Sequence, residues 1–392
     1  MTRFVAEIVD LLPALVACRH DLHAHPELAY DEHRTAGIVA DALRDIGCEV
    51  ATGIGGTGVV GVLRNGSSDR RIGLRADMDA LPMQEATGLK YRSRNVGAFH
   101  GCGHDGHTTM LIGAARHLAR TRRFDGTVVF VFQPAEEGQA GAKAMIEAGL
   151  FERFPVDRIF ALHNWPGLPF GHAATRPGPI MAAADRFEVT ITGRGGHAAE
   201  PHLASQVLSA ASRIVLAFDA IPSRRVVPTE KAVLSVTKMS GGTAHNVLPS
   251  EATVVGTVRS FSGAVQDRIE AVMRSVCAGV AAETDTTVGL EYLRYYPATI
   301  NDAVSAEIAL AAAKKVCLSA EVAPEPAFTS EDFAYMLQAR PGAYLWMGQG
   351  GGANGAPLHH PAYDFVDDLI GYGVGWYTAL VEGELSAATA AH

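Results

Sequence analysis

Apolar and polar positions follow two periods in the first part of the chain. Apolar residues between 38 and 46 have the spacing of an amphipathic helix, and a second helix is predicted over 108–119. Short, continuous apolar runs, typical of buried strands, cover 59–63, 72–74, 126–134, 158–162 and 343–347. This alternation predicts an α/β domain in which helices cover a sheet.

A different order of elements begins after Ala183. The predicted elements are a strand over 186–192, a helix over 203–218, strands over 232–239 and 252–261, a helix over 265–282 and a strand over 287–293. The order βαββαβ is typical of a ferredoxin-like α+β unit. Helix-rich sequence returns after Pro297. We therefore predict a catalytic domain formed by residues 1–183 and 297–392, with residues 184–296 inserted into it.

Length and composition agree with two soluble globular domains. The 392 residues exceed what one hydrophobic core usually supports, and 48% are hydrophobic. A net charge of -9 argues against a nucleic-acid partner. The sequence has neither an apolar run of membrane-spanning length nor the pattern of a signal peptide, so we expect no membrane partner. Five cysteines without framework spacing favour a reducing compartment, and we expect a cytoplasmic protein.

Side chains that can bind metals follow these predicted strands. Cys102 and His104 lie in a glycine-rich turn, and Glu137 and His163 each follow an apolar run. His359 comes after the run 343–347 and a glycine-rich segment. Ligands of open α/β sheets bind outside the carboxyl ends of the strands. The sequence therefore predicts one metal centre built from these five residues.

The size of this ligand set favours two metal ions over one. A single tetrahedral ion takes three or four ligands, and thiolate, imidazole and carboxylate groups suit Zn²⁺, Mn²⁺, Co²⁺ or Ni²⁺ alike. Two such ions can lower the pKa of a shared water toward about 7 and polarise a carbonyl group. Glu136, next to the ligand Glu137, is left free to transfer protons. This combination predicts hydrolysis of an acyl bond.

Six segments carry a resemblance to a known family. They read HDLHAHPEL (20–28), RADMDALP (75–82), HGCGHDGH (100–107), FQPAEEG (132–138), GRGGHAAEP (193–201) and SEDF (330–333). From about Arg19 to Asp364 the chain resembles the hippurate hydrolase and auxin-conjugate hydrolase branch of the aminoacylase/carboxypeptidase amidohydrolases. The resemblance implies a zinc-peptidase-like catalytic domain with a mixed sheet. It also implies that the inserted ferredoxin-like domain serves dimerisation, so that the protein is a homodimer or a higher homo-oligomer.

The resemblance also implies an activity. The family members are dinuclear amidohydrolases that cleave an N-acyl-L-amino acid, such as hippurate or an N-acetyl amino acid. The five residues named above match the metal ligands of the family, and Glu136 matches its general base. His197 matches a histidine that reaches the active site of the partner subunit and steadies the oxyanion.

Other matched positions have supporting roles. Asn246 and Arg259 resemble residues that hold the substrate carboxylate, a role for which the planar guanidinium of Arg259 is suited. Asp77 and Asp79 are expected to orient His104 or His107. The same orienting role is considered for Asp105 and His107. His360 stands where the family often has Asn or Ser, which leaves open whether His359 or His360 binds metal.

Two other functions remain open at this point. A metallo-carboxypeptidase or dipeptidase would use the same metals on a short peptide. A non-catalytic metal-binding homo-oligomer would keep the ligands and lose hydrolysis. Glu136 argues against the second alternative, because metal binding alone does not require a free base.

Overall fold

The computed structural model describes residues 6–351 and 355–386, which form two compact units. The first unit contains Met1–Ile180, Ile300–Glu325 and Asp332–His392, and the second contains Met181–Thr299 and Pro326–Glu331. The predicted insertion was 184–296, whereas the second unit of the structure contains Met181–Thr299 and also 326–331. The backbone amide of Ala182 donates to the carbonyl groups of Ala327 and Thr329, so this segment is held by the second unit.

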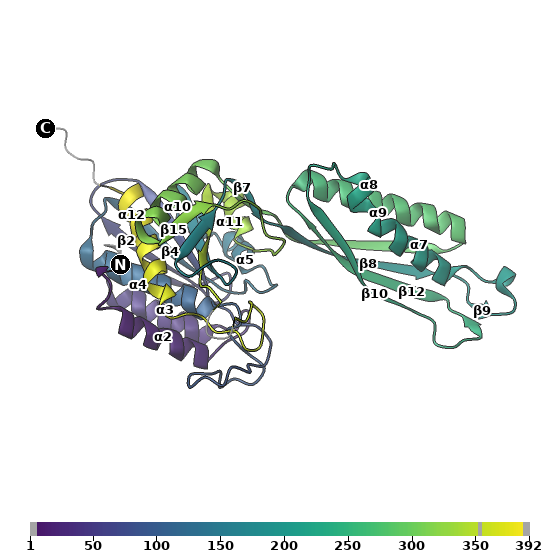
Figure 1. The fold of residues 1–392 in the computed structure, drawn as a ribbon, viewed down its shortest axis with the longest axis horizontal. Coiled ribbons are helices and arrows are strands. Elements are labelled where there is room, and N and C mark those ends of the chain that lie inside the picture. Colours follow the sequence, from purple (N-terminus) through teal and green to yellow (C-terminus); the bar gives the residue numbers. More distant parts are fainter. Residues whose placement is uncertain (1–5, 352–354, 387–392) are drawn as a thin grey trace. The chain divides into compact units, whose positions relative to one another are not determined.

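The first unit is built on an eight-stranded mixed sheet (Figure 1). In sheet order the strands are β1 (Glu49–Ile54), β2 (Gly58–Asn65), β4 (Gly126–Gln133), β3 (Arg71–Asp77), β5 (Arg158–Trp165), β16 (Gly342–Gly348), β6 (His172–Thr175) and β15 (Ser319–Val322). The four central strands β4, β3, β5 and β16 run parallel to one another. Their carboxyl ends therefore lie along one edge of the sheet, where the predicted ligands were expected to meet.

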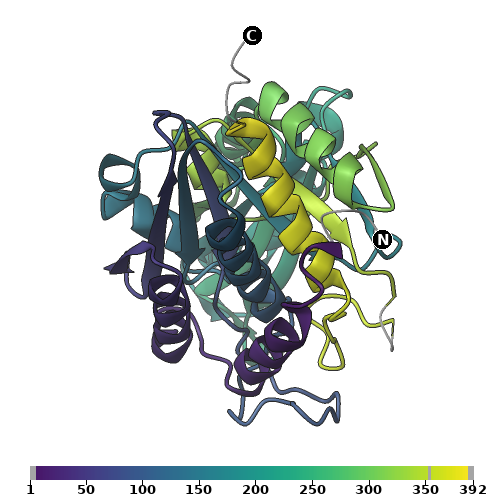
Figure 2. The same ribbon diagram turned by 90° about the vertical axis from the view of Figure 1, so that its left-hand side faces the viewer.

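Helices pack on this sheet. They are α2 (Leu12–Ala24), α3 (His33–Asp45), α4 (His104–Thr121), α5 (Gly141–Glu147), α6 (Leu150–Arg153), α10 (Ala303–Val316), α11 (Ala334–Ala339) and α12 (Leu369–Glu384). Figure 2 shows α3, α4, α12 and α10 beside one another across one face of the sheet. Helix α4 is buried along most of its length because α2 and α12 also pack against it. This burial fixes the end of α4 that lies next to the predicted ligands.

The second unit has the predicted ferredoxin-like order of elements. Its main strands are β8 (Ala183–Thr192), β10 (Ala232–Gly241), β12 (Glu251–Ser260) and β13 (Thr287–Tyr296), and its helices are α7 (Val207–Asp219), α8 (Ile221–Arg225) and α9 (Gly263–Thr284). The sheet order is β10-β12-β8-β13, with antiparallel neighbours throughout. Apolar side chains of α7 and α9 pack on this sheet around the buried Phe187 and Phe218.

The short elements are β7 (Gly178–Met181), β9 (Gly196–His197), β11 (Val247–Leu248), β14 (Thr299–Asn301) and the 3₁₀ helix η1 (Pro201–Leu203). All five cysteines lie in the described ranges and are free thiols. Within residues 6–351 and 355–386, no helix combines the length and the apolar character that crossing a membrane requires.

Candidate metal centre

The two ligands nearest to α4 occupy different kinds of backbone. Cys102 lies in a turn, whereas His104 is the first residue of α4, which begins four residues before the predicted start at 108. The prediction that a turn holds both residues is therefore wrong. Gly103 between them has φ 91°, and a Cβ atom there would lie 2.4 Å from Oδ1 of Asn164. A glycine is needed at this position for both reasons.

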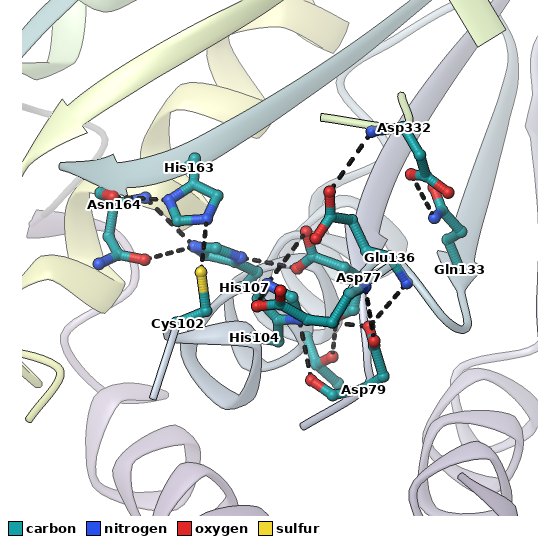
Figure 3. Close-up of polar contacts among 12 residues, drawn as sticks. Asp77, Asp79, Cys102, His104, His107, Gln133, Glu136, His163, Asn164 and Asp332 are labelled. Carbon is teal, nitrogen blue, oxygen red and sulfur yellow. Dashed lines mark hydrogen bonds and ion pairs between the residues drawn. The ribbon is translucent and has the colours of Figure 1, made fainter. Parts of the chain in front are cut away.

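The five predicted ligands come together in space. Sγ of Cys102 lies 3.4 Å from Nε2 of His163, and Oε1 of Glu137 lies 3.9 Å from Nε2 of His104 and 3.2 Å from Nε2 of His359. The ligand atoms of Cys102, His104 and His163 lie within 4.8 Å of one another, as do those of Cys102, Glu137 and His359. Figure 3 shows Cys102, His104 and His163 facing one region beside Glu136. The geometry thus places two overlapping groups of ligands around a shared thiol.

The chemistry of these atoms fits bound cations. Nε2 of His104 is buried and has no hydrogen-bond partner within the described residues, and the buried Oε1 of Glu137 faces the imidazole nitrogens of His104 and His359. Such buried polar atoms are costly unless a partner, here a metal ion, satisfies them. Burial raises the pKa of the Cys102 thiol well above its usual range, and Glu137, Glu136 and Asp77 raise it further. The site is therefore rich in negative charge, which a divalent cation would offset.

Backbone carbonyl groups orient two of the imidazole rings. Nδ1 of His104 donates to the carbonyl oxygen of Asp79 at 2.9 Å, and Nδ1 of His163 donates to that of Asn164 at 2.6 Å. A donor at Nδ1 leaves Nε2 as the atom that can bind metal. Burial lowers the pKa of His104, but Asp77, Asp79 and Glu137 outweigh burial and raise it to about 10. The pKa of His163 is instead lowered well below its usual range, first by burial and then by His107.

Asp77 and His107 belong to a buried chain of polar contacts behind the ligands. Oδ1 of Asp77 lies 2.7 Å from Nδ1 of His107, and Oδ2 accepts a hydrogen bond from Arg75 at 2.8 Å. Nε2 of His107 lies 2.7 Å from Oδ1 of Asn164. Asp77 Oδ2 is 3.8 Å from Nε2 of His104, so its contact with this ligand is electrostatic. Both ring nitrogens of His107 face partners in this chain.

Asp79 holds the backbone that carries the two adjacent glutamates. Its Oδ1 accepts the amide of Glu136 at 3.0 Å and its Oδ2 accepts the amide of Glu137 at 2.9 Å. Oε1 of Glu136 in turn accepts the amide of Asp332 at 3.4 Å. Glu136 is 7% exposed, and its carboxylate lies in one group of candidate ligand atoms with the imidazole of His104 and the carboxylate of Glu137. Contacts of both its backbone and its side chain thus fix Glu136 beside the ligands.

Asp105 does not contact the ligands through its side chain. Its carboxylate pairs with Nδ1 of His23 at 2.8 Å and with Arg19 at 3.3 Å. Burial lowers the pKa of His23, but hydrogen bonds to Asp105 and Glu85 outweigh burial and raise it to about 9. The expected orienting contact from Asp105 to a ligand is therefore absent from the described contacts. Its side chain instead ties α2 to the start of α4.

The two candidate histidines near the end of the chain differ in position. His359 has φ 62° and its Nε2 lies 3.2 Å from Glu137. Both side chains are exposed, but Nδ1 of His360 accepts the amide of Ala362 at 3.1 Å, within its own loop. His359 is thus the one whose ring faces the other ligands.

His197 and Asn246 lie together in the second unit, apart from Arg259. Strand β9 with His197 pairs with β11, and the amide of Ala198 donates to the carbonyl of Asn246 at 3.1 Å. Both side chains line an open groove of about 650 Å³. Arg259 lies near the other end of β12, about 26 Å along an extended strand from Glu251, which also lines the groove. One chain therefore does not bring Asn246 and Arg259 to the same carboxylate.

Three residues with evident roles at the site were missed. Arg75, Asn164 and Asp332 connect the ligands to Glu136 through buried contacts. All three occur in or next to segments singled out in the sequence. Asp77, one partner of Arg75, is two residues away, but the contacts of Arg75 with Asp332, of Asn164 with His107 and of Asp332 with Glu136 join residues 57 to 257 positions apart. Arg75 and Asn164 could have been marked by their position at the end of apolar runs, whereas no apolar run precedes Asp332 in the SEDF segment.

Comparisons with known proteins agree with this geometry. A family model described as Peptidase family M20/M25/M40 matches residues 73–383. The chain is 39% identical over 381 residues to a protein of Campylobacter jejuni named hippurate hydrolase, covering 96% of this chain and 98% of that protein. It is 35% identical to thermostable carboxypeptidase 1 of Saccharolobus solfataricus, covering 94% of each. A solved Bacillus subtilis structure, described as a dinuclear metal binding peptidase, has a TM-score of 0.84 at 33% identity and covers 96% of this chain and 99% of its own.

Proposed function

The chain belongs to Peptidase family M20/M25/M40 and is a hydrolase, and from this premise we propose that it cleaves the amide bond of N-acyl-L-amino acids. The products would be a carboxylate and an amino acid. The relative named hippurate hydrolase supports this substrate class. The observation that carries the proposal is Glu136, a buried carboxylate held beside a complete set of ligands.

In this proposal, the ligands hold two divalent cations per subunit, Zn²⁺, Mn²⁺, Co²⁺ or Ni²⁺. The ligands are Cys102, His104, Glu137, His163 and His359. The buried Nε2 of His104, which has no hydrogen-bond partner within the described residues, supports this assignment, and so does the dinuclear description of the similar structure. When bound, such ions would lower the pKa of a water molecule toward about 7 and would polarise the carbonyl group of the substrate.

Glu136 acts as the general base. Its carboxylate takes the proton of the attacking water and delivers it to the leaving nitrogen, which then departs as an amine. Asp79 fixes the backbone of Glu136, and the backbone amide of Asp332 donates to the Glu136 carboxylate. The base therefore keeps one orientation through the reaction. Asp77 and His107 support the ligands from behind, as described above.

His197, Asn246 and Arg259 bind and stabilise the reacting substrate. His197 donates to the developing oxyanion, while Asn246 and Arg259 bind the substrate carboxylate. Because Asn246 and Arg259 lie apart within one chain, His197 and Asn246 would come from a second copy of the chain. Mixing inactive Glu136→Gln and His197→Ala subunits should then restore part of the activity. Absence of recovery despite proven subunit exchange would contradict this arrangement.

A carboxypeptidase activity is the second candidate, because a relative of similar identity carries that name. It would use the same base and the same metals on the bond before a C-terminal residue. Release of amino acid from N-acetyl, N-benzoyl and dipeptide substrates, each with a panel of metals, separates the two. The proposal expects a higher kcat/KM for the N-acyl substrates, and a higher value for dipeptides would favour the carboxypeptidase.

The role of Glu136 is tested by Glu136→Gln. This change should lower kcat by roughly 10²–10⁴-fold, because the amide cannot accept the proton, while bound metal stays at the wild-type level. Glu152→Gln, at an exposed position of α6, is the matched control and should retain wild-type kcat. Full activity of the metal-loaded Glu136→Gln protein would refute the proposal.

A further inference from the structure

A strained loop leads from β4 to the general base. Ala135, the residue before Glu136, has φ 53°, and Ala140 at the end of the loop has φ 55°. Residues with a Cβ atom disfavour this left-handed region, so the surrounding structure must hold the loop there. Ala135 is fully buried, and its carbonyl accepts the amide of Gly141 at 3.0 Å.

The segment before α3 holds this loop at both ends. Oε1 of Glu32 accepts the amide of Ala135 at 2.8 Å, and the hydroxyl of Tyr30 donates to the carbonyl of Gln139 at 2.9 Å. The second oxygen of Glu32 accepts the hydroxyl of Thr57. Glu32 comes from a part of the sequence more than 100 residues before the loop.

The Glu32 carboxylate is costly to bury. Its side chain is fully buried, and burial raises its pKa. Its described hydrogen bonds go to Ala135 and Thr57, so it is not among the proposed metal ligands or substrate contacts. Burying this carboxylate costs folding free energy, which indicates that the hydrogen bonds it accepts have a function.

These contacts fix the direction of the backbone where it enters Glu136. The backbone angles of Ala135 set where the next residue, Glu136, leaves the loop, and the Glu32 carboxylate fixes the amide on one side of those angles. Asp79 fixes the amide of Glu136 on the other side. Releasing the Ala135 amide would let this residue relax toward negative φ and would move the Glu136 carboxylate.

We propose that Glu32 is a positioning residue for Glu136, which it holds in place by anchoring the left-handed backbone of Ala135. The inference rests on the proposed role of Glu136 as the base. It assigns a function to Glu32 at the start of α3, a residue that has no part in the proposed reaction itself.

The test compares Glu32→Ala with a variant that removes the need for the anchor. Glu32→Ala should lower kcat roughly 10–100-fold and change KM less than about threefold, because a displacement near 1 Å is enough to cost a factor of this size. Ala135→Gly in the Glu32→Ala background should recover most of the lost kcat, since glycine adopts positive φ without strain. Glu32→Gln should keep most of the wild-type kcat, because its amide oxygen can accept from the amide of Ala135 while its amide nitrogen donates to Thr57.

Two further variants keep the test decisive. Asp125→Ala removes a carboxylate that accepts the amides of Ser67 and Ser68 and that lies at the opposite end of β4 from Glu136, so it should lower the melting temperature without changing kcat. If Glu32→Ala does not fold, Glu32→Asp draws the carboxylate back by one methylene, and its loss of kcat should likewise be reduced by Ala135→Gly.

The possible outcomes separate this inference from the proposed function. Wild-type kcat in folded, metal-loaded Glu32→Ala, or a loss that Ala135→Gly does not reduce, would overturn the inference. A fall in metal content that matches the fall in kcat would also overturn it, because Glu32 would then act on the ligands. Full activity of Glu136→Gln would instead refute the proposed function itself, whatever Glu32→Ala does.

Discussion

Arg75 offers the most direct test of the buried network behind the metal centre. Its guanidinium is fully buried and donates to Asp77 at 2.8 Å and to Gln133 at 2.8 Å, with Asp332 at 3.3 Å. Arg75→Met keeps most of the side-chain length but leaves two buried carboxylates without their cation. Removing one partner of a buried ion pair typically costs about 3–5 kcal/mol, and we expect a loss of unfolding free energy in this range.

A surface ion pair in the same unit provides the matched control. Arg158 lies 3.1 Å from Asp302, and both side chains are about one third exposed. Arg158→Met should therefore cost less than about 1 kcal/mol, since water and salt screen such pairs. The contrast between the two arginines isolates the effect of burial.

Denaturation followed by tryptophan fluorescence measures this loss. The three tryptophans, Trp165, Trp346 and Trp376, all lie in the first unit, so the signal reports the unit that contains Arg75. Guanidinium titrations of the wild type and both variants then give the difference in free energy. If Arg75→Met loses no more than Arg158→Met, the buried network does not stabilise the unit as argued.

The pH dependence of this loss has a defined sign. Although burial opposes it, His104 and Arg75 hold the pKa of Asp77 well below its usual range. The stabilisation by a carboxyl whose pKa is depressed in the folded state is present above its unfolded value, about 3.9, and is lost as the pH falls through the folded value. The difference between wild type and Arg75→Met should therefore be constant near neutral pH and shrink below about pH 4.

Three further predictions concern the ligands and the packing around them. His359→Ala should lose bound metal in elemental analysis, whereas His360→Ala should retain it; loss in both variants would contradict the assignment to His359. Because a bound cation must displace the proton of His104, whose pKa is raised to about 10, metal affinity measured by calorimetry should increase from about pH 6 to pH 8, and a flat profile would contradict this. Gly106→Ala would place a Cβ atom 2.4 Å from a buried ring and should destabilise the protein by about 1–3 kcal/mol, whereas Gly37→Ala, with nothing within 4 Å in a helix, should stabilise it by up to about 1 kcal/mol; equal effects would contradict the packing argument.

Local patterns in the sequence were enough to predict the fold class and the closeness of the ligands in space. The apolar runs before Glu136 and His163 are the buried strands β4 and β5, and the order of elements after Ala183 gives the ferredoxin-like unit. Since the central strands are parallel, residues that follow them reach one edge of the sheet. This step needs only the position of a residue after its strand, which one sequence contains.

Pairings across long distances in the chain could not be predicted in the same way. Glu32 holds Ala135 and Arg75 holds Asp332, but nothing in the local spacing selects these partners. The separation of Asn246 from Arg259 was also missed, because it depends on the length and direction of β12. The early start of α4 at His104 was hidden by glycines that usually indicate a turn.

Anomalous X-ray diffraction from crystals grown with excess Zn²⁺ or Mn²⁺ tests the central claim most directly. We expect two anomalous peaks per chain inside the cluster of Cys102, His104, Glu137, His163 and His359, with the Glu136 carboxylate next to them and outside both coordination spheres. Peaks located elsewhere, a cluster without peaks, or direct ligation by Glu136 in place of Glu137 would contradict it.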